Sequence, residues 1–243
     1  MIVDFTRRSQ EVEIMDDLAC KGEVVDQTLR ELDVINQWLG GDGITINTVK
    51  HVLKKESSGK SIALVDIGCG SGKMLRLISK YTEKSNLNVD LLGIDANPNI
   101  VQFANDHTSP EHGIQFKALD IFSEEFKEIK CDILLATLFL HHFDQEQLTT
   151  LFRQLKFQVK GCIIVNDLHR HPLAYYSFKL ISTLFSKSAM VKFDGPLSVL
   201  RSFKKKDWEM ILQNAGIEQY SLSWKWAFRW KLIIYPVQHK QTR

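Results

Sequence analysis

This sequence of 243 residues lacks the features that mark several common classes of protein. Its four cysteines, Cys20, Cys69, Cys131 and Cys162, lie far apart and form no CxxC pair. That spacing argues against a zinc knuckle or a disulfide framework, and it predicts a reducing, cytoplasmic compartment. No apolar run approaches the roughly 18 residues that a membrane span needs, and the N-terminus has no apolar signal-peptide core. The formal net charge is only +2, so charge gives no reason to expect nucleic acid as a partner.

What the sequence does have is an alternation of short apolar runs with helical patterns from residue 61 onward. The pattern predicts strands at residues 62–68, 90–95, 114–120, 131–140 and 161–168. Two further β-rich runs follow the last helix. Asn97, Asp144 and Gly216 are typical of residues at helix ends. Strands alternating with helices predict a parallel sheet with helices on both faces.

Two segments stand outside this alternation. Residues 1–60 are expected to form a helical N-terminal cap, and residues 61–243 the main domain. Within that domain, residues of about 169–200 interrupt the pattern after the fifth strand and are expected to form a lid. Both segments are placed to cover the carboxyl edge of the sheet, where ligands bind in open α/β folds.

A glycine-rich loop follows the first predicted strand, in the stretch VDIGCGSGK that begins at Val65. A dinucleotide-binding G-x-G-x-x-G motif would need glycine at position 73, which is Lys73. The phosphate-binding pattern G-x-x-x-x-G-K-[ST] also fails. Both failures weaken a nicotinamide or nucleotide-triphosphate function, although a flavodoxin-like or hydride-transfer fold with tight glycine turns stays open as an alternative.

The loop resembles the first motif of class I S-adenosylmethionine-dependent methyltransferases, an acidic residue followed by G-x-G-x-G. The resemblance implies S-adenosyl-L-methionine as the cofactor and a Rossmann-like, doubly wound sheet of seven strands, mostly parallel with an antiparallel C-terminal strand. In that family the loop passes beneath the methionine part of the cofactor, so a Cβ atom on the glycines is expected to block the approach. The implied cofactor-binding residues are Asp66, Gly68, Cys69, Gly70, Gly72, Asp95, Ala96, Asn97, Asp120, Ile121 and Thr137.

The resemblance also assigns roles to these residues. Asp66 supports the loop and the ammonium end of the cofactor, and Asp95 accepts hydrogen bonds from the ribose hydroxyls. Asp120 reads the adenine amino group, with Ile121 against the ring. The backbone of residues 96–97 touches the adenine, and Thr137, at the exit of the fourth strand, lines the methionine portion.

Histidines follow the fourth and fifth strands, at the same edge of the sheet. Methyl transfer to a hydroxyl benefits from a base that works near neutral pH, which favours histidine. If the exit of the fourth strand is extended, only one of His141 and His142 reaches the site, and we favour His142. The predicted catalytic residues are therefore His142, His169 and His171, unless the histidines only bond the backbone at strand ends. No acidic triad accompanies them, so no metal is expected.

The segment after the fifth strand is rich in apolar and basic residues and predicts the kind of acceptor. A small apolar or phenolic molecule fits it, which an acyl carrier or a membrane surface could present. The fourth-strand motif lacks the Asp/Asn-Pro-Pro-aromatic pattern typical of nucleic-acid amine methylation, so nucleic acid is not expected. Asp194 and Arg201 are expected to pair across a loop, and four aromatic residues at period two, Trp224 to Trp230, to share one strand face.

The chain further resembles bacterial methyltransferases of polyketide and phenolic-lipid pathways, which implies secondary metabolism. The resemblance favours O-methylation of a phenolic or polyketide-derived hydroxyl. Two alternatives stay open: a C-methyltransferase acting on a quinone-like ring, and a cofactor-binding partner protein without turnover. The sequence does not determine the oligomeric state.

Overall fold

A single sheet organises the chain in the computed structural model, which describes residues 3–56 and 60–236. Its strand order is β3-β2-β1-β4-β5-β7-β6. The first five strands are parallel, and β7 runs antiparallel to both of its neighbours. This arrangement confirms the predicted fold class. The strands are β1 (Ile62–Ile67), β2 (Val89–Asp95), β3 (Ile114–Ala118), β4 (Cys131–Thr137), β5 (Val159–Leu168), β6 (Tyr220–Lys225) and β7 (Arg229–Ile234).

Helices cover both faces of the sheet, as the alternation predicts. Buried side chains of α2 (Gly41–Glu56) and α3 (Lys73–Lys84) form one apolar cluster with the strands. A second cluster on the other face joins α5 (Glu124–Lys127), α6 (Gln145–Gln158) and α9 (Lys205–Asn214) to the sheet. Helix α4 (Pro98–Asp106) packs against β2 and β3. Apolar packing on both faces fixes the strands in place, and the strands in turn position the loops at their ends.

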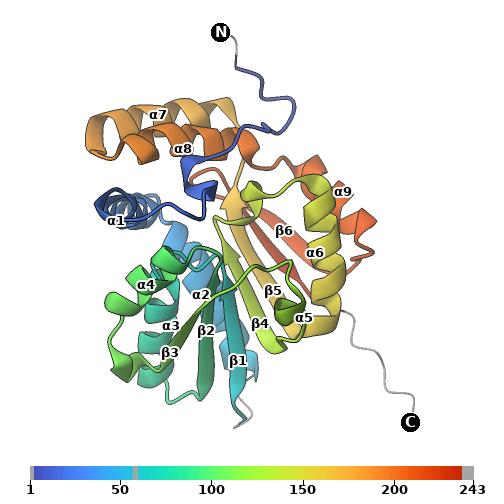
Figure 1. Cartoon of the computed structure of the whole chain (residues 1–243). Helices are drawn as coiled ribbons and strands as arrows, with labels where there is room; N and C mark the ends of the chain where they lie inside the picture. The colour runs from blue at the N-terminus through green and yellow to red at the C-terminus, as the bar shows by residue number, and fades with distance from the viewer. Residues whose placement is uncertain (1–2, 57–59, 237–243) are drawn as a thin grey trace.

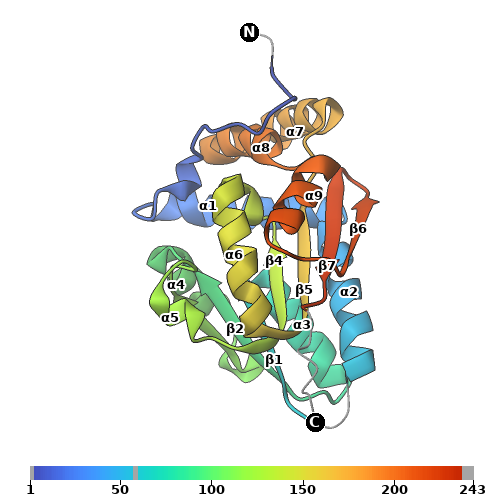
Figure 2. The same ribbon diagram turned by 90° about the vertical axis from the view of Figure 1, so that its right-hand side faces the viewer.

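A cap of short elements stands over the carboxyl ends of the parallel strands. It comprises η1 (Ile14–Asp16), α1 (Glu23–Trp38), α7 (Pro172–Phe185) and α8 (Ala189–Arg201). Figures 1 and 2 both show α7 and α8 above the strand ends, with α1 between them and the sheet. Helix α8 contacts α1, α7 and η1, so segments from both halves of the chain meet there. Two further 3₁₀ turns are η2 (Pro110–His112) and η3 (Leu140–His142).

The predicted helix ends are confirmed in detail. The Asn97 side chain accepts the backbone N–H of Asn99 at the start of α4. Asp144 accepts the N–H of Gln147 and forms a capping box at the start of α6. Gly216 lies just past α9 with φ +66°, which a glycine adopts without steric cost. Local sequence chemistry therefore sets these boundaries.

Two expectations about the C-terminal part are wrong. The stretch from Asp194 to Arg201 is helical, within α8, and these two residues bond to the N-terminal segment rather than to each other. The four aromatic residues do not share one strand. Trp224 lies in β6 and Trp230 opposite it in β7, because a turn through residues 226–228 folds the run into a hairpin. Alternation at period two does not distinguish one long strand from a tight hairpin.

Within the described part of the chain, no helix combines the length and apolar character that crossing a membrane requires.

Candidate functional site

A cavity of about 790 Å³ lies at the carboxyl ends of the parallel strands, beneath the cap. Its volume falls in the range of pockets that hold small molecules and cofactors. The floor comes from the loops after β1, β2 and β4, and the roof comes from η1, α1, α7 and α8. Ten predicted cofactor-binding residues line it: Asp66, Gly68, Cys69, Gly70, Asp95, Ala96, Asn97, Asp120, Ile121 and Thr137.

The glycine loop has the predicted shape, but the steric reason for its glycines differs from the expected one. Gly68, Gly70 and Gly72 all have positive φ, between 51° and 75°. A Cβ on Gly68 would lie 2.1 Å from the Phe139 ring, and one on Gly72 would lie 2.6 Å from Phe116. Only a Cβ on Gly70 would be 4.0 Å from its nearest neighbour. Side chains of the protein therefore require two of the glycines, and Gly72 lies outside the cavity lining.

Two carboxylates stand at the ends of β1 and β2, Asp66 buried and Asp95 partly exposed. Asp66 is 2% exposed, and its Oδ1 has no hydrogen-bond partner. Burial, with a smaller effect from Asp95, raises the pKa of Asp66 to about 8. The Asp95 oxygens accept the backbone N–H groups of Gly70 and Asn97, at 3.2 and 3.0 Å. An unpaired buried carboxylate oxygen facing a cavity fits a ligand that brings a cation or a hydrogen-bond donor.

The residues beyond β3 and β4 complete the floor. Asp120 is exposed toward the cavity and caps its own loop by accepting the N–H of Phe122 at 2.9 Å. Ile121 beside it is 4% exposed and supplies an apolar surface. Thr137 Oγ1 lies 3.2 Å from Thr45 Oγ1 of α2. Cys69 is buried, and burial raises its thiol pKa well above the usual value, so it acts as a small filler.

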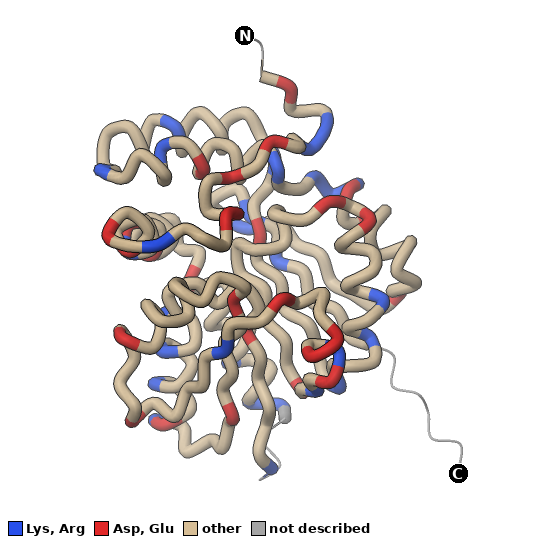
Figure 3. The backbone as a smooth tube through the Cα atoms, viewed as in Figure 1, with Lys and Arg blue, Asp and Glu red and all other residues tan. Residues whose placement is uncertain are grey.

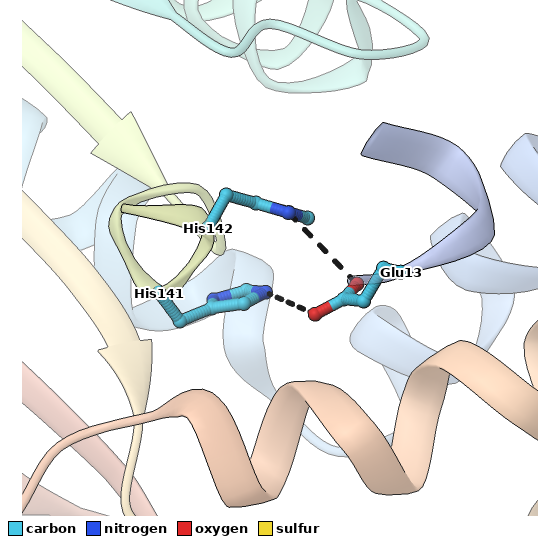
Figure 4. A group of neighbouring side chains, drawn as sticks. All are labelled: Glu13, His141 and His142. Atoms are coloured by element: carbon cyan, nitrogen blue, oxygen red, sulfur yellow. Dashed lines mark ion pairs between the residues drawn. The ribbon is translucent and has the colours of Figure 1, made fainter. Parts of the chain in front are cut away.

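The exit of β4 is a 3₁₀ turn, η3, rather than an extended segment, so the expected division between the two histidines is wrong. Both His141 and His142 line the cavity, with ring centroids 4.4 Å apart. Figure 4 shows both rings pointing from this turn toward Glu13 of the N-terminal segment. His141 Nε2 lies 3.8 Å from Glu13 Oε1, and His142 Nδ1 lies 3.9 Å from Glu13 Oε2.

His141 is held by a carboxylate that the sequence reasoning missed. Asp167, at the end of β5, is fully buried, and its Oδ1 accepts the Nδ1–H of His141 at 2.8 Å. Its Oδ2 accepts the backbone N–H of Leu140. Burial would raise the pKa of Asp167, but the contacts with His141 and the N–H of Leu168 outweigh it and lower the pKa. With Nδ1 donating, Nε2 of a neutral His141 offers its lone pair to the cavity.

A network of charges closes the cavity above the histidines. Arg201 of α8 bonds to Asp16 and lies 3.8 Å from Glu13 Oε1. His142 Nδ1 donates to Asp16 Oδ1. Burial raises the pKa of Glu13 to about 7, against the lowering effect of His142 and Arg201. A carboxyl group with that pKa can accept or release a proton near neutral pH.

The same group has a geometry that a metal ion could use. Among the described residues, ligand atoms of Glu13, His141 and His142 all lie within 4.8 Å of one another. The guanidinium of Arg201 already places a positive charge beside Glu13. We therefore interpret the group as a site for proton transfer rather than for metal binding.

The other two predicted catalytic histidines lie outside the cavity lining. His169 Nδ1 accepts the indole N–H of Trp224 at 3.2 Å. Burial, followed by the neighbouring His171, lowers the pKa of His169 to about 4. His171 caps α7 by accepting the N–H of Leu173, and its ring stacks on Phe228. Both side chains contribute to an aromatic cluster beside the β6–β7 hairpin, and this placement does not support either of them as the base.

A second buried charge was also missed. Arg229, the first residue of β7, lines the cavity at 2% exposure, and its Nε and Nη1 have no hydrogen-bond partner. Asn36 of α1 also lines the cavity and leaves its Oδ1 unpaired. No local signal in the sequence marks Arg229, whereas Asp167 could have been found as an acid at the end of an apolar strand. Unpaired acceptors at Asp66 and Asn36, and unpaired donors at Arg229, would suit a ligand with both an ammonium and a carboxylate group.

Comparisons with known proteins relate this chain to methyltransferases. Residues 64–161 match the family model described as a methyltransferase domain. The phosphoethanolamine N-methyltransferase of Plasmodium falciparum is 27% identical over 125 residues, a match that covers 50% of this chain and 45% of that protein. This chain therefore aligns with about half the length of its curated relative.

Solved structures share the fold over most of the chain. The plantazolicin methyltransferase BpumL, in complex with SAH, has a TM-score of 0.62 at 17% identity, covering 88% of this chain and 95% of that one. Human N-acetylserotonin methyltransferase, in complex with SAM, has a TM-score of 0.58 at 18% identity, covering 88% and 56%. The match to the methyltransferase family model confirms the resemblance read from the glycine loop, and these solved structures show the shared fold.

The unpaired oxygen of Asp66 generates a prediction about binding and pH. Because Asp66 with a pKa of about 8 must lose its proton to pair with an ammonium group, the affinity for S-adenosylhomocysteine should rise from pH 6 to pH 8. The rise should be at most about tenfold per pH unit and should level off above pH 8. Isothermal titration calorimetry in two buffers of different ionisation enthalpy should show proton release on binding.

Asp66→Asn should weaken binding by about 10- to 100-fold and remove the pH slope, since the amide does not titrate. The exposed Asp106→Asn on α4 serves as the matched control and should bind like the wild type. A slope that persists unchanged in Asp66→Asn would assign the titration to another group.

Proposed function

We propose that this chain, which contains a class I S-adenosylmethionine-dependent methyltransferase domain, transfers a methyl group to the hydroxyl of a small apolar acceptor, phenolic or polyketide-derived. One observation carries the proposal: a single cavity joins the carboxylates Asp66 and Asp95 to a histidine, His141, that a buried carboxylate orients. The first group suits the cofactor, and the second suits the removal of a proton from an acceptor.

The floor of the cavity would hold the cofactor. Asp66 Oδ1 would accept from the ammonium group, and the Asp95 carboxylate, which keeps further acceptor capacity, from the ribose hydroxyls. Asp120 and Ile121 would contact the adenine, with the backbone of residues 96–97 and Thr137 beside the nucleoside and methionine parts. When bound, S-adenosylmethionine supplies an electrophilic methyl group on a sulfonium centre.

Arg229 would hold the carboxylate of the same ligand. Its guanidinium has two unpaired nitrogens in a buried setting, and burial lowers its pKa to about 10, which still leaves it charged at neutral pH. Salt bridges between arginine and a carboxylate are strong when solvent is excluded. Together, Asp66 and Arg229 would fix the two charged ends of the amino-acid tail and so orient the sulfur toward the histidines.

His141 would act as the general base. Its Nδ1–H donates to Asp167, so Nε2 can take the proton of an acceptor hydroxyl while Asp167 stabilises the imidazolium that forms. Glu13, 3.8 Å from Nε2, lies where it could take that proton from His141. The network of Arg201 and Asp16 holds Glu13 and His142 in place and helps to exclude water.

The remainder of the cavity is apolar and favours an apolar acceptor. Phe139 and Phe143 line it from the β4 exit, and Phe178, Ile181 and Val191 line it from the cap helices. These side chains leave few hydrogen-bond partners for a highly polar substrate, so binding would rest on apolar contact area.

The test is an assay of purified protein with methyl-labelled S-adenosylmethionine and a panel of acceptors. We expect label on the oxygen of alkyl-substituted phenols, identified by mass spectrometry and NMR, and none on phosphoethanolamine. Label on a ring carbon of a hydroquinone would replace this proposal with the C-methyltransferase alternative. Binding of S-adenosylhomocysteine without turnover of any acceptor would favour the partner-protein alternative.

Removing the base gives a sharper prediction. His141→Gln should lower kcat by about 10²- to 10⁴-fold, because no group then takes the proton. Its affinity for S-adenosylhomocysteine should stay within about twofold of the wild type, which also shows that the variant folds. His169→Gln and His171→Gln, whose side chains lie outside the cavity, should keep kcat within about threefold.

A loss in His169→Gln as large as that in His141→Gln would overturn this assignment. Recovery of wild-type activity by Zn²⁺ after dialysis against a chelator would instead indicate that Glu13, His141 and His142 bind a metal.

Arg229→Met tests the carboxylate site. The affinity for S-adenosylhomocysteine should fall by about 10- to 100-fold, because a buried charged hydrogen bond is lost. Binding of 5′-methylthioadenosine, which has the nucleoside but lacks the amino-acid tail, should not change. Equal losses for both ligands would show that Arg229 has only a structural role, and unchanged affinity for both would place the carboxylate elsewhere.

A further inference from the structure

The outer surface of the cap helices carries a row of large apolar side chains. Leu173, Tyr176, Leu180 and Leu184 recur every three or four residues, so they form one stripe along α7. With two neighbours they make up what we call the cap face: Leu173, Tyr176, Leu180, Leu184, Phe185 and Phe193. Each of the six is between 52% and 65% exposed.

An adjoining side of α7 lines the cavity. Ala174, Ser177, Phe178 and Ile181 line the cavity beneath it. Helix α7 is therefore apolar on two sides, and only one of them is explained by packing against the described part of the chain. Contiguous exposed apolar residues of this kind mark surfaces that bind a partner or a membrane.

The charges on α7 and the start of α8 have one sign, whereas Glu31 of the neighbouring α1 accepts hydrogen bonds from residues 186–188 just past the end of α7. From Pro172 to Phe193 the sequence has no Asp or Glu, and its three lysines, Lys179, Lys187 and Lys192, are all exposed. The next acid, Asp194, is buried and accepts backbone N–H groups of the N-terminal segment. In Figure 3, α7 and the start of α8 accordingly carry only basic positions. Lysines beside apolar side chains complement an anionic surface.

Aromatic side chains extend the cap face toward α1. The Trp38 ring at the end of α1 is 67% exposed and lies 6.2 Å from the Phe185 ring, edge to face. Tyr and Trp are enriched where a protein meets lipid headgroups, because they combine an apolar ring with a polar group. A straight apolar stripe with aromatic rings and flanking lysines suits a flat lipid surface better than the compact, acidic surface of a carrier protein.

We propose that the cap face binds an anionic lipid bilayer, with α7 lying in the headgroup region. The apolar stripe enters the boundary of the acyl chains, and the lysines pair with anionic headgroups. Because another side of α7 lines the cavity, binding through the cap face would bring the bilayer close to the cavity. The proposal goes beyond methyl transfer and is measured without any acceptor, so the failure of one leaves the other intact.

Co-sedimentation of the full chain with vesicles tests the proposal. We expect binding to phosphatidylcholine vesicles that contain 30% phosphatidylglycerol, weaker binding as salt rises, and little binding to phosphatidylcholine alone. The double variant Leu180→Asp/Leu184→Asp should reduce the bound fraction at least about tenfold. The matched control is Phe157→Asp on α6, an equally exposed apolar residue away from the cap face, which should bind like the wild type. Affinity for S-adenosylhomocysteine should be unchanged in all variants, which shows that they fold.

Three outcomes would overturn the proposal. The first is wild-type protein that stays in solution with the anionic vesicles. The second is a dimer, seen by light scattering, that the double variant splits, which would assign the cap face to a second copy of the chain. The third is binding to an acyl carrier protein, abolished in the double variant, without binding to vesicles.

Discussion

The hydrogen bonds of Asp167 hold the candidate site together. This fully buried carboxylate at the end of β5 accepts the ring N–H of His141 and the backbone N–H groups of Leu140, His141 and Leu168. Four donors around one carboxylate offset the cost of burying its charge. They also convert the exit of β4 into a 3₁₀ turn, which brings both histidines to the cavity. A strand that simply continued would have turned one of them away.

The N-terminal segment depends on that turn. Arg8 donates to the backbone carbonyls of His141 and Phe143, and Arg201 donates to those of His141 and His142. The carbonyls left free by the 3₁₀ turn therefore anchor two arginines, and Arg201 in turn anchors Asp16. The segment that roofs the cavity is therefore held by the same turn that carries the histidines. A change at Asp167 would disturb both His141 and the segment that carries Glu13.

The features that depend on neighbouring residues could be predicted from the sequence. Strand, glycine turn and helix at residues 62–84 follow from short-range sterics, and the helix caps at Asn97 and Asp144 follow from single side chains. The steric reason for the glycines could not be predicted, because the side chains that crowd two of them come from elsewhere in the chain: Phe116 from β3 and Phe139 from the segment between β4 and η3. Glu13 and Asp167 flank His141 only after folding, from positions 154 residues apart (167 − 13), and Arg229 reaches the cavity from a third segment, so no spacing rule connects them. His169 and His171 follow a strand end closely, yet the backbone bonds of residues 169 and 170 to residues 228 and 203 place both rings in the aromatic cluster beside the hairpin, outside the cavity lining.

The cavity lining offers two kinds of polar group. At β1 and β7, a carboxyl oxygen of Asp66 and two guanidinium nitrogens of Arg229 lack partners, and a zwitterionic tail would satisfy both once Asp66 loses its proton. Near η3, Arg201, Asp16 and His142 pair with one another, and Glu13 leaves its Oε1 without a hydrogen bond beside His141 Nε2, so under the proposed function that part of the cavity would supply proton transfer. Helix α7 lines the cavity with Phe178 and Ile181. A ligand recognised by charge on one side and an acceptor recognised by apolar contact on the other would meet where His141 Nε2 faces the cavity, and that meeting point is what the chemistry of methyl transfer to a hydroxyl requires.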